Sequence, residues 1–371
     1  MSTARLLDAE TLAMLRDGLA RFHQDSYAFE RRQSRLDAAV GYSRQAWQAY
    51  ASLGWVSMAV PSDLGGFDGD ARAIGALMEY VGSALAMEPV LASAVTCARL
   101  LARCRGARAD RWLADIASGR AIFAFAHAES VTDGAFGTVS TSFRQGHLTG
   151  TKSVVLHGDV ADRLLVTARD ETGALVVCCV DRSGPGVQMS RYPLVDGRGA
   201  ASFEFTEADA EVVPAKSGVE SIVEEVLDES RVAMCAEALG AIQSLNAATL
   251  EYLKTRKQFG RPIGANQVLQ HRMVDLYVLQ EETRALIEAA QRALSGVRED
   301  RIRAVSAAAA HAATASRQTS HEAVQMHGGM GIVVELPVSH YFKRLMVTAR
   351  LLGDRDDHVA RFAKVSQAED T

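Results

Sequence analysis

The C-terminal part of the chain carries the pattern that most restricts its fold. Apolar residues recur at intervals of three and four from Leu269 to Leu294, which is the spacing of one helix face. The segment 307–315 consists mostly of alanine and predicts a helix with closely packed neighbours. Long helices with wide apolar faces bury those faces against one another. We therefore predict a helical bundle over residues 219–371.

A different pattern separates this bundle from the N-terminus. Residues 120–218 contain short β-rich runs divided by Gly, Asp and Pro turn signals, which predicts a compact β-barrel domain. The predicted strands are 122–125, 164–168, 175–180 and 202–205. Residues 1–119 carry a helical stripe at Leu12, Leu15, Leu19 and Phe22, which predicts an α-helical N-terminal domain.

Composition excludes several functional classes. Apolar residues make up 48% of the chain and the formal net charge is −5, with no basic patch, so nucleic-acid binding is not expected. The five cysteines form no CxxC pair and lie in apolar stretches, which indicates buried, reduced thiols. The scattered histidines predict no metal site. The sequence shows neither a signal peptide nor an apolar run of about 20 residues, so we expect a cytoplasmic protein without a membrane span.

Two short motifs invite a chemical interpretation. The first, RKQFGRPIG at 256–264, follows a predicted helix, and an arginine beside a turn with free N–H groups suits an anionic ligand. The second, QMHGGMG at 325–331, exposes backbone to close approach. Taken alone, each motif is better explained as an ordinary helix end, with cations near the C-terminal dipole or a glycine cap.

Together the motifs resemble those of the acyl-CoA dehydrogenase family. The resemblance extends to PVSHYFKR at 337–344, to GTK at 150–152 and to GDVAD at 158–162, and it spans essentially the whole chain. It implies an α-helical N-terminal domain, a middle β-barrel and a C-terminal four-helix bundle. The predicted boundaries are 1–119, 120–218 and 219–371. In detail the sequence is most similar to small subunits of pimeloyl-CoA dehydrogenases and, more loosely, to heteromeric acyl-CoA dehydrogenases of steroid side-chain breakdown.

The resemblance also implies a cofactor and a reaction. FAD lies between subunits in this family, and its ADP half contacts the neighbouring subunit. The residues matched to that contact are Arg256, Gln258, Phe259, Gln325, Gly328 and Gly329. The family desaturates an acyl-CoA thioester: a glutamate removes the α-proton while the β-hydrogen passes to the flavin as hydride. The implied partners are an acyl-CoA substrate, an electron-transfer flavoprotein as acceptor and further subunits in a dimer or tetramer.

The sequence departs from the family where the flavin ring and the catalytic base belong. The usual glutamate position matches Leu352, and the alternative position matches Ser230, so both lack a carboxylate. The Thr-Glu-Pro segment is Ala128-Glu129-Ser130, and the positions that cover the flavin are Val154 and Leu156. The changes therefore fall on the ring-binding half of the site, whereas the motifs that serve a neighbour's FAD are retained.

This asymmetry predicts the partner subunit of a heteromeric acyl-CoA dehydrogenase. Two alternatives stay open: a catalytically silent subunit that binds FAD or acyl-CoA to organise its partner, and a different flavin oxidation on the same fold. Glu237, two turns beyond Ser230 among small apolar neighbours, is a rival candidate for the base. The structural alternative for Glu237 is a buried ion pair with Arg231 or Arg272.

Overall fold

A computed structural model describes residues 9–27, 29, 32, 36, 41–130, 137–215 and 218–367. These residues belong to two compact units. The first unit takes its residues from the segments Met1–Ala13, Arg31–Ile74 and Met87–Ser230. The second takes them from Met14–Glu30, Gly75–Ala86 and Arg231–Thr371.

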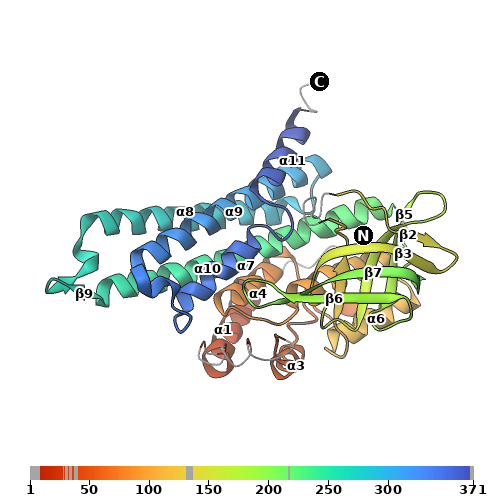
Figure 1. The fold of residues 1–371 in the computed structure, drawn as a ribbon, viewed down its shortest axis with the longest axis horizontal. Helices are drawn as coiled ribbons and strands as arrows, with labels where there is room; N and C mark the ends of the chain where they lie inside the picture. The colour runs from red at the N-terminus through yellow and green to blue at the C-terminus, as the bar shows by residue number, and fades with distance from the viewer. Residues whose placement is uncertain are drawn as a thin grey trace. The chain divides into compact units, whose positions relative to one another are not determined.

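Helices precede the strands along the chain, as the N-terminal pattern predicts (Figure 1). They are α1 (Ala9–Ser26), α3 (Arg44–Ser52), the 3₁₀ turn η2 (Ser62–Leu64), α4 (Ala71–Ser83), the π-helix η3 (Val90–Cys97), α5 (Ala98–Cys104) and α6 (Ala107–Ala117). Every residue of η3 is buried. The Ser93 hydroxyl of η3 accepts a hydrogen bond from the Phe123 amide at 3.0 Å and so fixes the start of the first strand.

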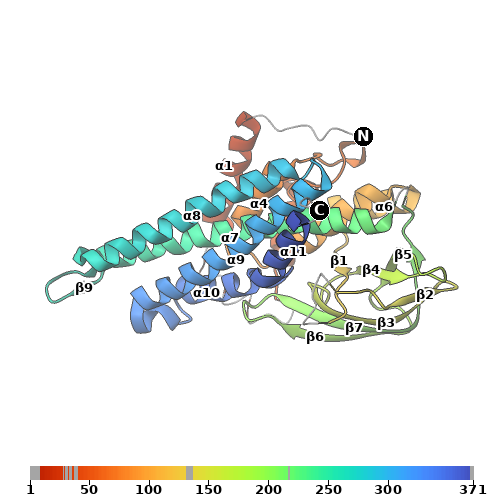
Figure 2. The ribbon, with the colours of Figure 1, turned by 90° about the horizontal axis from the view of Figure 1, so that it is seen from above.

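The middle of the chain forms one eight-stranded sheet. Its strands are β1 (Phe123–Ala126), β2 (Ser142–Arg144), β3 (His147–Leu156), β4 (Arg163–Arg169), β5 (Leu175–Asp181), β6 (Val187–Pro193), β7 (Gly199–Asp209) and β8 (Glu211–Val212). They follow the order β6-β7-β3-β2-β4-β5-β8, with β1 beside β4. Only the pairs β1–β4 and β2–β4 are parallel (Figure 2). Five consecutive residues of β4, from 164 to 168, are buried, so both faces of this strand are covered.

Helices return at Val219, where the predicted bundle begins. They are α7 (Val219–Thr255), α8 (Gln267–Ala293), α9 (Arg298–His327), α10 (Pro337–Thr348) and α11 (Arg355–Gln367), with the short elements β9 (Lys257–Gln258), β10 (Arg261–Pro262), η5 (Ile263–Ala265) and η6 (Gly328–Ile332). In the second unit, a core cluster joins Ala238, Ile242 and Leu245 of α7 to residues of α9 and α10. None of the described helices is long and apolar enough to cross a membrane.

The secondary structure changes where the sequence pattern changes. Helix α6 ends at Ala117, β1 begins at Phe123 and α7 begins at Val219. The division into three domains at 119 and 218 stays a prediction, since the structure groups the same residues into two units. All five cysteines are free and buried, as predicted.

Helices α4 and α7 meet within the second unit at two glycines. A Cβ atom on Gly82 would lie 1.8 Å from the Glu237 carbonyl oxygen, and one on Gly240 would lie 1.9 Å from the Glu79 carbonyl oxygen. The two backbones therefore approach so closely that no side chain fits at either position. Burial at this crossing also raises the pKa of Glu79.

We predict that Gly240→Ala lowers the free energy of unfolding by about 3 kcal/mol or more, at the upper end of the usual cost of overpacking, because the obstructing atoms are backbone. Gly18→Ala is the control: Gly18 lies in α1 with nothing within 4 Å of its added Cβ, so about 0.5–1 kcal/mol of stabilisation is expected. Denaturant unfolding measures both variants. Equal stability of the two would contradict the close crossing.

Candidate functional site

The first motif folds into an exposed hairpin directly after α7. Strands β9 and β10 pair Gln258 with Arg261, which leaves Phe259 and Gly260 as a two-residue turn. Both turn residues have positive φ, 52° and 80°, as hairpins of this length favour. Such a φ is strained for a bulky residue. The Phe259 side chain is nevertheless 100% exposed, so no packing of the described residues compensates for that strain.

The second motif forms the end of α9 and the turn after it. Gly328 has a φ of 61°, and no described atom lies within 4 Å of a Cβ added to Gly328 or Gly329. Internal packing therefore does not require glycine at 329, and the bare backbone stays open to a ligand. Gln325, one turn earlier, is also exposed.

Contacts between side chains bring the two motifs together. The rings of Tyr252 and His327 stack with centroids 4.3 Å apart, and the Tyr252 hydroxyl donates to the His327 carbonyl oxygen at 3.4 Å. Leu253 and Met326 share an apolar cluster with Leu276. Because Tyr252 and Leu253 immediately precede the hairpin, these contacts hold both turns at the same end of the bundle.

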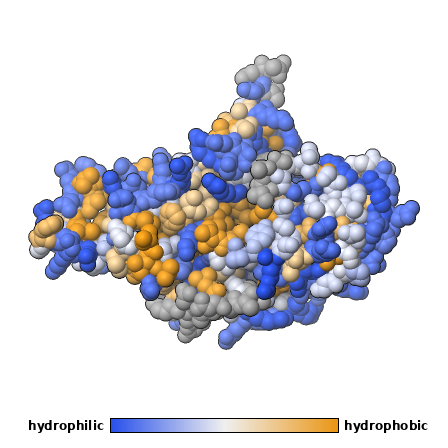
Figure 3. Space-filling view, in the orientation of Figure 1, coloured by the Kyte–Doolittle hydropathy of each residue, from blue (hydrophilic) through white to orange (hydrophobic). Residues whose placement is uncertain are grey.

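The combined surface suits the anionic half of a dinucleotide cofactor. Arg256 is exposed and has no ion-pair partner among the described residues. A guanidinium group of this kind binds a phosphate bidentately, and the open glycine backbone allows close approach. Hydrophobic surface lies among hydrophilic surface over the bundle helices, toward the left of Figure 3. The exposed apolar residues of this unit include Phe259 and Ile332.

Neither family position for the catalytic base offers a proton acceptor of the right kind. The Ser230 hydroxyl donates to the Val226 carbonyl oxygen at 2.7 Å, so its contact with Thr96 Oγ1 at 2.8 Å is one in which Thr96 donates. Leu352 lies between α10 and α11, and its carbonyl oxygen accepts from Arg231 Nε at 3.1 Å. The serine hydroxyl is thus satisfied locally, and the leucine serves through its backbone.

Glu237, the rival candidate for the base, forms a buried ion pair. Its Oε1 lies 3.0 Å from Arg344 Nη1, and both side chains are 0% exposed. Arg344 Nη2 also donates to the Ala86 carbonyl oxygen at 2.8 Å. The structure gives Arg344 as a partner of Glu237, while Arg231 donates to the Leu352 carbonyl oxygen and Arg272 pairs with Glu322. The enclosure of Glu237 favours a structural role, and its role as the base stays a prediction.

In the first unit, the positions matched to the flavin ring surround a buried lysine. Lys152 Nζ donates to Glu129 Oε1 at 2.7 Å, to the His127 carbonyl oxygen and to Thr167 Oγ1. Burial lowers the pKa of Lys152 to about 8. Burial opposes ionisation of Glu129, but hydrogen bonds from Lys152, Ser140 and Thr141 lower its pKa to about 2. Glu129 is therefore a structural carboxylate and makes a poor proton acceptor.

The edge of this cluster is distorted by a β-bulge. The register of β3 against β7 shifts between Lys152 and Val155, and Val154 within the bulge has a φ of 51°. Positive φ in a β-branched residue is a genuine outlier, and bulges often re-aim side chains beside functional sites. Ala128 contributes a backbone contact, since its carbonyl oxygen accepts from the Ser153 amide at 2.8 Å. It has no hydroxyl to offer a flavin.

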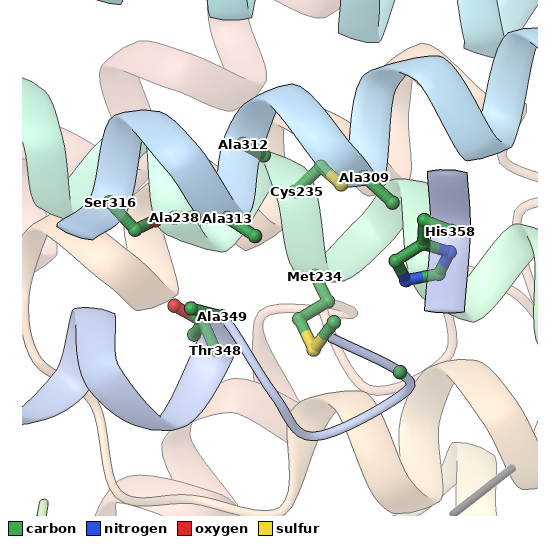
Figure 4. A pocket seen from close by; sticks show the side chains of 11 residues that line it. Met234, Cys235, Ala238, Ala309, Ala312, Ala313, Ser316, Thr348, Ala349 and His358 are labelled. Atoms are coloured by element: carbon green, nitrogen blue, oxygen red, sulfur yellow. The ribbon is translucent and has the colours of Figure 1, made fainter. Parts of the chain in front are cut away.

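A small pocket lies elsewhere in the second unit (Figure 4). Met234 and Cys235 of α7, alanines of α9 and His358 of α11 line it, as Figure 4 shows. Burial raises the pKa of Cys235 to about 12, so its thiol stays protonated. The lining is small and mostly apolar, and none of the residues predicted to bind the cofactor or to act as the base is part of it.

Sequence patterns missed several residues that organise the site. Arg344 lies inside the PVSHYFKR motif at 337–344 and was not singled out as the partner of Glu237. Tyr252 and His327 carry the stack that joins the two motifs. The available signal was position: Tyr252 lies one helical turn before Arg256, and His327 lies between Gln325 and Gly328.

Comparisons with known proteins agree with this architecture. Residues 9–120 match the family "Acyl-CoA dehydrogenase, N-terminal domain", and residues 216–366 match "Acyl-CoA dehydrogenase, C-terminal domain". Acyl-CoA dehydrogenase IpdE2 of Mycolicibacterium smegmatis is 26% identical, with 95% of this chain and 98% of that protein covered.

Two solved structures share the fold. The crystal structure of the ChsE4-ChsE5 complex from Mycobacterium tuberculosis has a TM-score of 0.88 and 26% identity, and the match covers 98% of each chain. The structure described as PigA with FAD and proline has a TM-score of 0.88 over 99% of this chain and 100% of that one. Its identity is 18%, so that likeness concerns the fold alone.

We predict that Glu237→Gln destabilises the chain by about 3–5 kcal/mol, because it removes the carboxylate that pairs with the buried Arg344 side chain. The matched control is Glu322→Gln, which removes an ion pair with Arg272 whose side chains are 40% and 42% exposed and should cost at most about 1 kcal/mol. Denaturant unfolding compares the two. A stable Glu237→Gln chain whose assembled enzyme loses turnover would instead support Glu237 as the base.

Proposed function

Because the chain belongs to the acyl-CoA dehydrogenase family of flavoprotein oxidoreductases, we propose that it is one subunit of a heteromeric FAD-dependent acyl-CoA dehydrogenase. In this proposal the chain holds the ADP half of an FAD whose ring and catalytic glutamate belong to another polypeptide. One observation carries the proposal: the two ADP-binding turns are joined and exposed, while both family positions for the base lack a carboxylate.

The chemistry of the exposed turns supports FAD as the ligand. Arg256 would pair with the pyrophosphate, and the backbone of Gly328 and Gly329 would lie against it. Gln258 and Gln325 would supply amide hydrogen bonds to the same half of the cofactor. Phe259, which has no packing partner within the described chain, would contact the assembled partner or its FAD. Bound FAD supplies the hydride acceptor of the family reaction.

The substrate and the acceptor follow from the family resemblance. An acyl-CoA thioester is the proposed substrate, and an electron-transfer flavoprotein is the proposed acceptor. The name of one related structure, the ChsE4-ChsE5 complex, describes two different chains together, which supports a heteromeric assembly here.

A catalytically silent partner subunit is the second candidate. The enclosed Glu237–Arg344 ion pair favours it, because it removes the remaining proposed base of this chain from contact with a substrate. In that case the partner's active site performs every chemical step, and this chain contributes binding surface alone.

The proposal is tested on native protein. Purification from its source should yield this chain together with a second acyl-CoA dehydrogenase chain that keeps the glutamate, with fewer FAD molecules than subunits. A homogeneous assembly of this chain alone, with one FAD per chain and good turnover, would refute the heteromeric proposal.

A substitution tests the half-site itself, meaning the surface of this chain that would bind the ADP half of FAD. Arg256→Ala should weaken FAD binding to the assembled enzyme by roughly 10- to 100-fold, the usual cost of a lost charge-assisted hydrogen bond. Arg292→Ala is the control, because Arg292 is an exposed cation in the last turn of α8. Released and bound flavin are measured by fluorescence during dilution. Equal FAD retention by both variants would overturn the assignment of Arg256.

A further inference from the structure

The geometry points to His327 as a further contact residue for the cofactor, one that accepts a hydrogen bond from the adenosine of FAD. This inference deepens the proposed function and rests on it. The histidine lies between Gln325 and Gly328 in the chain, but its imidazole has a chemistry that neither neighbour offers.

The protonation state of the ring follows from one hydrogen bond. His327 Nδ1 lies 2.8 Å from the Ala323 carbonyl oxygen, one turn back along α9. A carbonyl oxygen only accepts, so Nδ1 carries the proton and Nε2 of the neutral ring is an acceptor. Burial lowers the pKa of His327, against the opposing effect of the bond to Ala323, so the neutral form is favoured.

The orientation of the ring is fixed on two sides. Tyr252 stacks on it with an interplanar angle of 23°, and Ala323 holds Nδ1. Nε2 has no hydrogen-bond partner among the described residues, and it is not one of the fully enclosed unpartnered atoms. His327 is 5% exposed, so this unpartnered acceptor belongs to a ring that is held in place directly before the open turn at Gly328 and Gly329.

An acceptor in this position selects for a ligand group that carries an N–H or O–H. The pyrophosphate of FAD has no such donor at neutral pH and suits Arg256 instead. The adenosine has donors of two kinds, the exocyclic amine of adenine and the ribose hydroxyls. The two side chains therefore bind different parts of the cofactor: Arg256 binds the pyrophosphate, and His327 binds the adenosine.

The test combines a ring replacement with changes in the ligand. His327→Phe keeps an aromatic ring against Tyr252 but removes both nitrogens. His321→Phe is the matched control on the same helix, since His321 Nδ1 also bonds a carbonyl oxygen one turn back, that of Arg317 at 2.6 Å. FAD affinity of the assembled enzyme is compared with affinity for an analogue that carries hypoxanthine in place of adenine and for one with 2′-deoxyribose on the adenosine. The ratio of affinities within each variant cancels any general loss of stability.

We expect His327→Phe to weaken FAD binding about tenfold, as the loss of one hydrogen bond does, and His321→Phe to change it little. In the wild type one analogue should bind about tenfold more weakly than FAD, and in His327→Phe that difference should vanish. Loss with the hypoxanthine analogue assigns the amine, and loss with the deoxy analogue assigns the hydroxyl.

Two results separate the failure of this inference from failure of the proposed function. If Arg256→Ala weakens FAD binding while His327→Phe keeps the wild-type preference for FAD over both analogues, the role of His327 is overturned and the half-site stands. If neither variant affects FAD binding, the half-site itself is refuted, and the inference falls with it.

Discussion

The second unit depends on a place where two helix backbones touch. At Gly82 and Gly240 no side chain separates α4 from α7, and an added Cβ would lie within 2 Å of a carbonyl oxygen on the facing helix. The same region is closed by Arg344 of α10, which binds Glu237 of α7 and the Ala86 carbonyl oxygen. Close backbone contact excludes water, and a charge placed beside it is stable only when its counter-ion is present.

That arrangement explains why Glu237 resembles a candidate base in the sequence and why its surroundings in the structure favour a structural role. Its neighbours are small because a helix has to pass close by. A carboxylate in such a place resembles a desolvated catalytic base, but Glu237 is paired with Arg344 and fully buried. The small residues and the buried charge therefore have one cause, which is the packing of α4, α7 and α10.

The sequence predicts the fold well where burial is continuous along a strand. The runs 164–168 and 175–180 lie in β4 and β5, which are mostly buried. Strand β6 escaped prediction because its residues, Val187–Pro193, alternate between partial and full exposure and carry Gln, Ser and Arg. The family resemblance and the helix–sheet–helix order are confirmed.

The site is less accessible to sequence reasoning, because its pairings join distant parts of the chain. The sequence offered Arg231 or Arg272 as partners of Glu237, and it did not indicate the bond to Arg344, 107 positions away. The stack of Tyr252 on His327 likewise joins residues 75 positions apart. The motifs mark which segments matter, and only the packed helices show which side chains meet.

Phe259 is as exposed in the folded chain as in an unfolded one, so it contributes nothing through burial to the stability of its own fold. Covering such a side chain contributes about 1.5–3 kcal/mol, and that free energy can be gained only when another molecule packs against it. A survey of substitutions scored by the stability of the isolated chain would therefore rank position 259 among the most tolerant. Natural selection acts on the assembled protein, in which a substitution at position 259 would also affect association. A position that tolerates substitution in the isolated chain but not in the assembly would therefore mark the surface at which this chain meets another molecule.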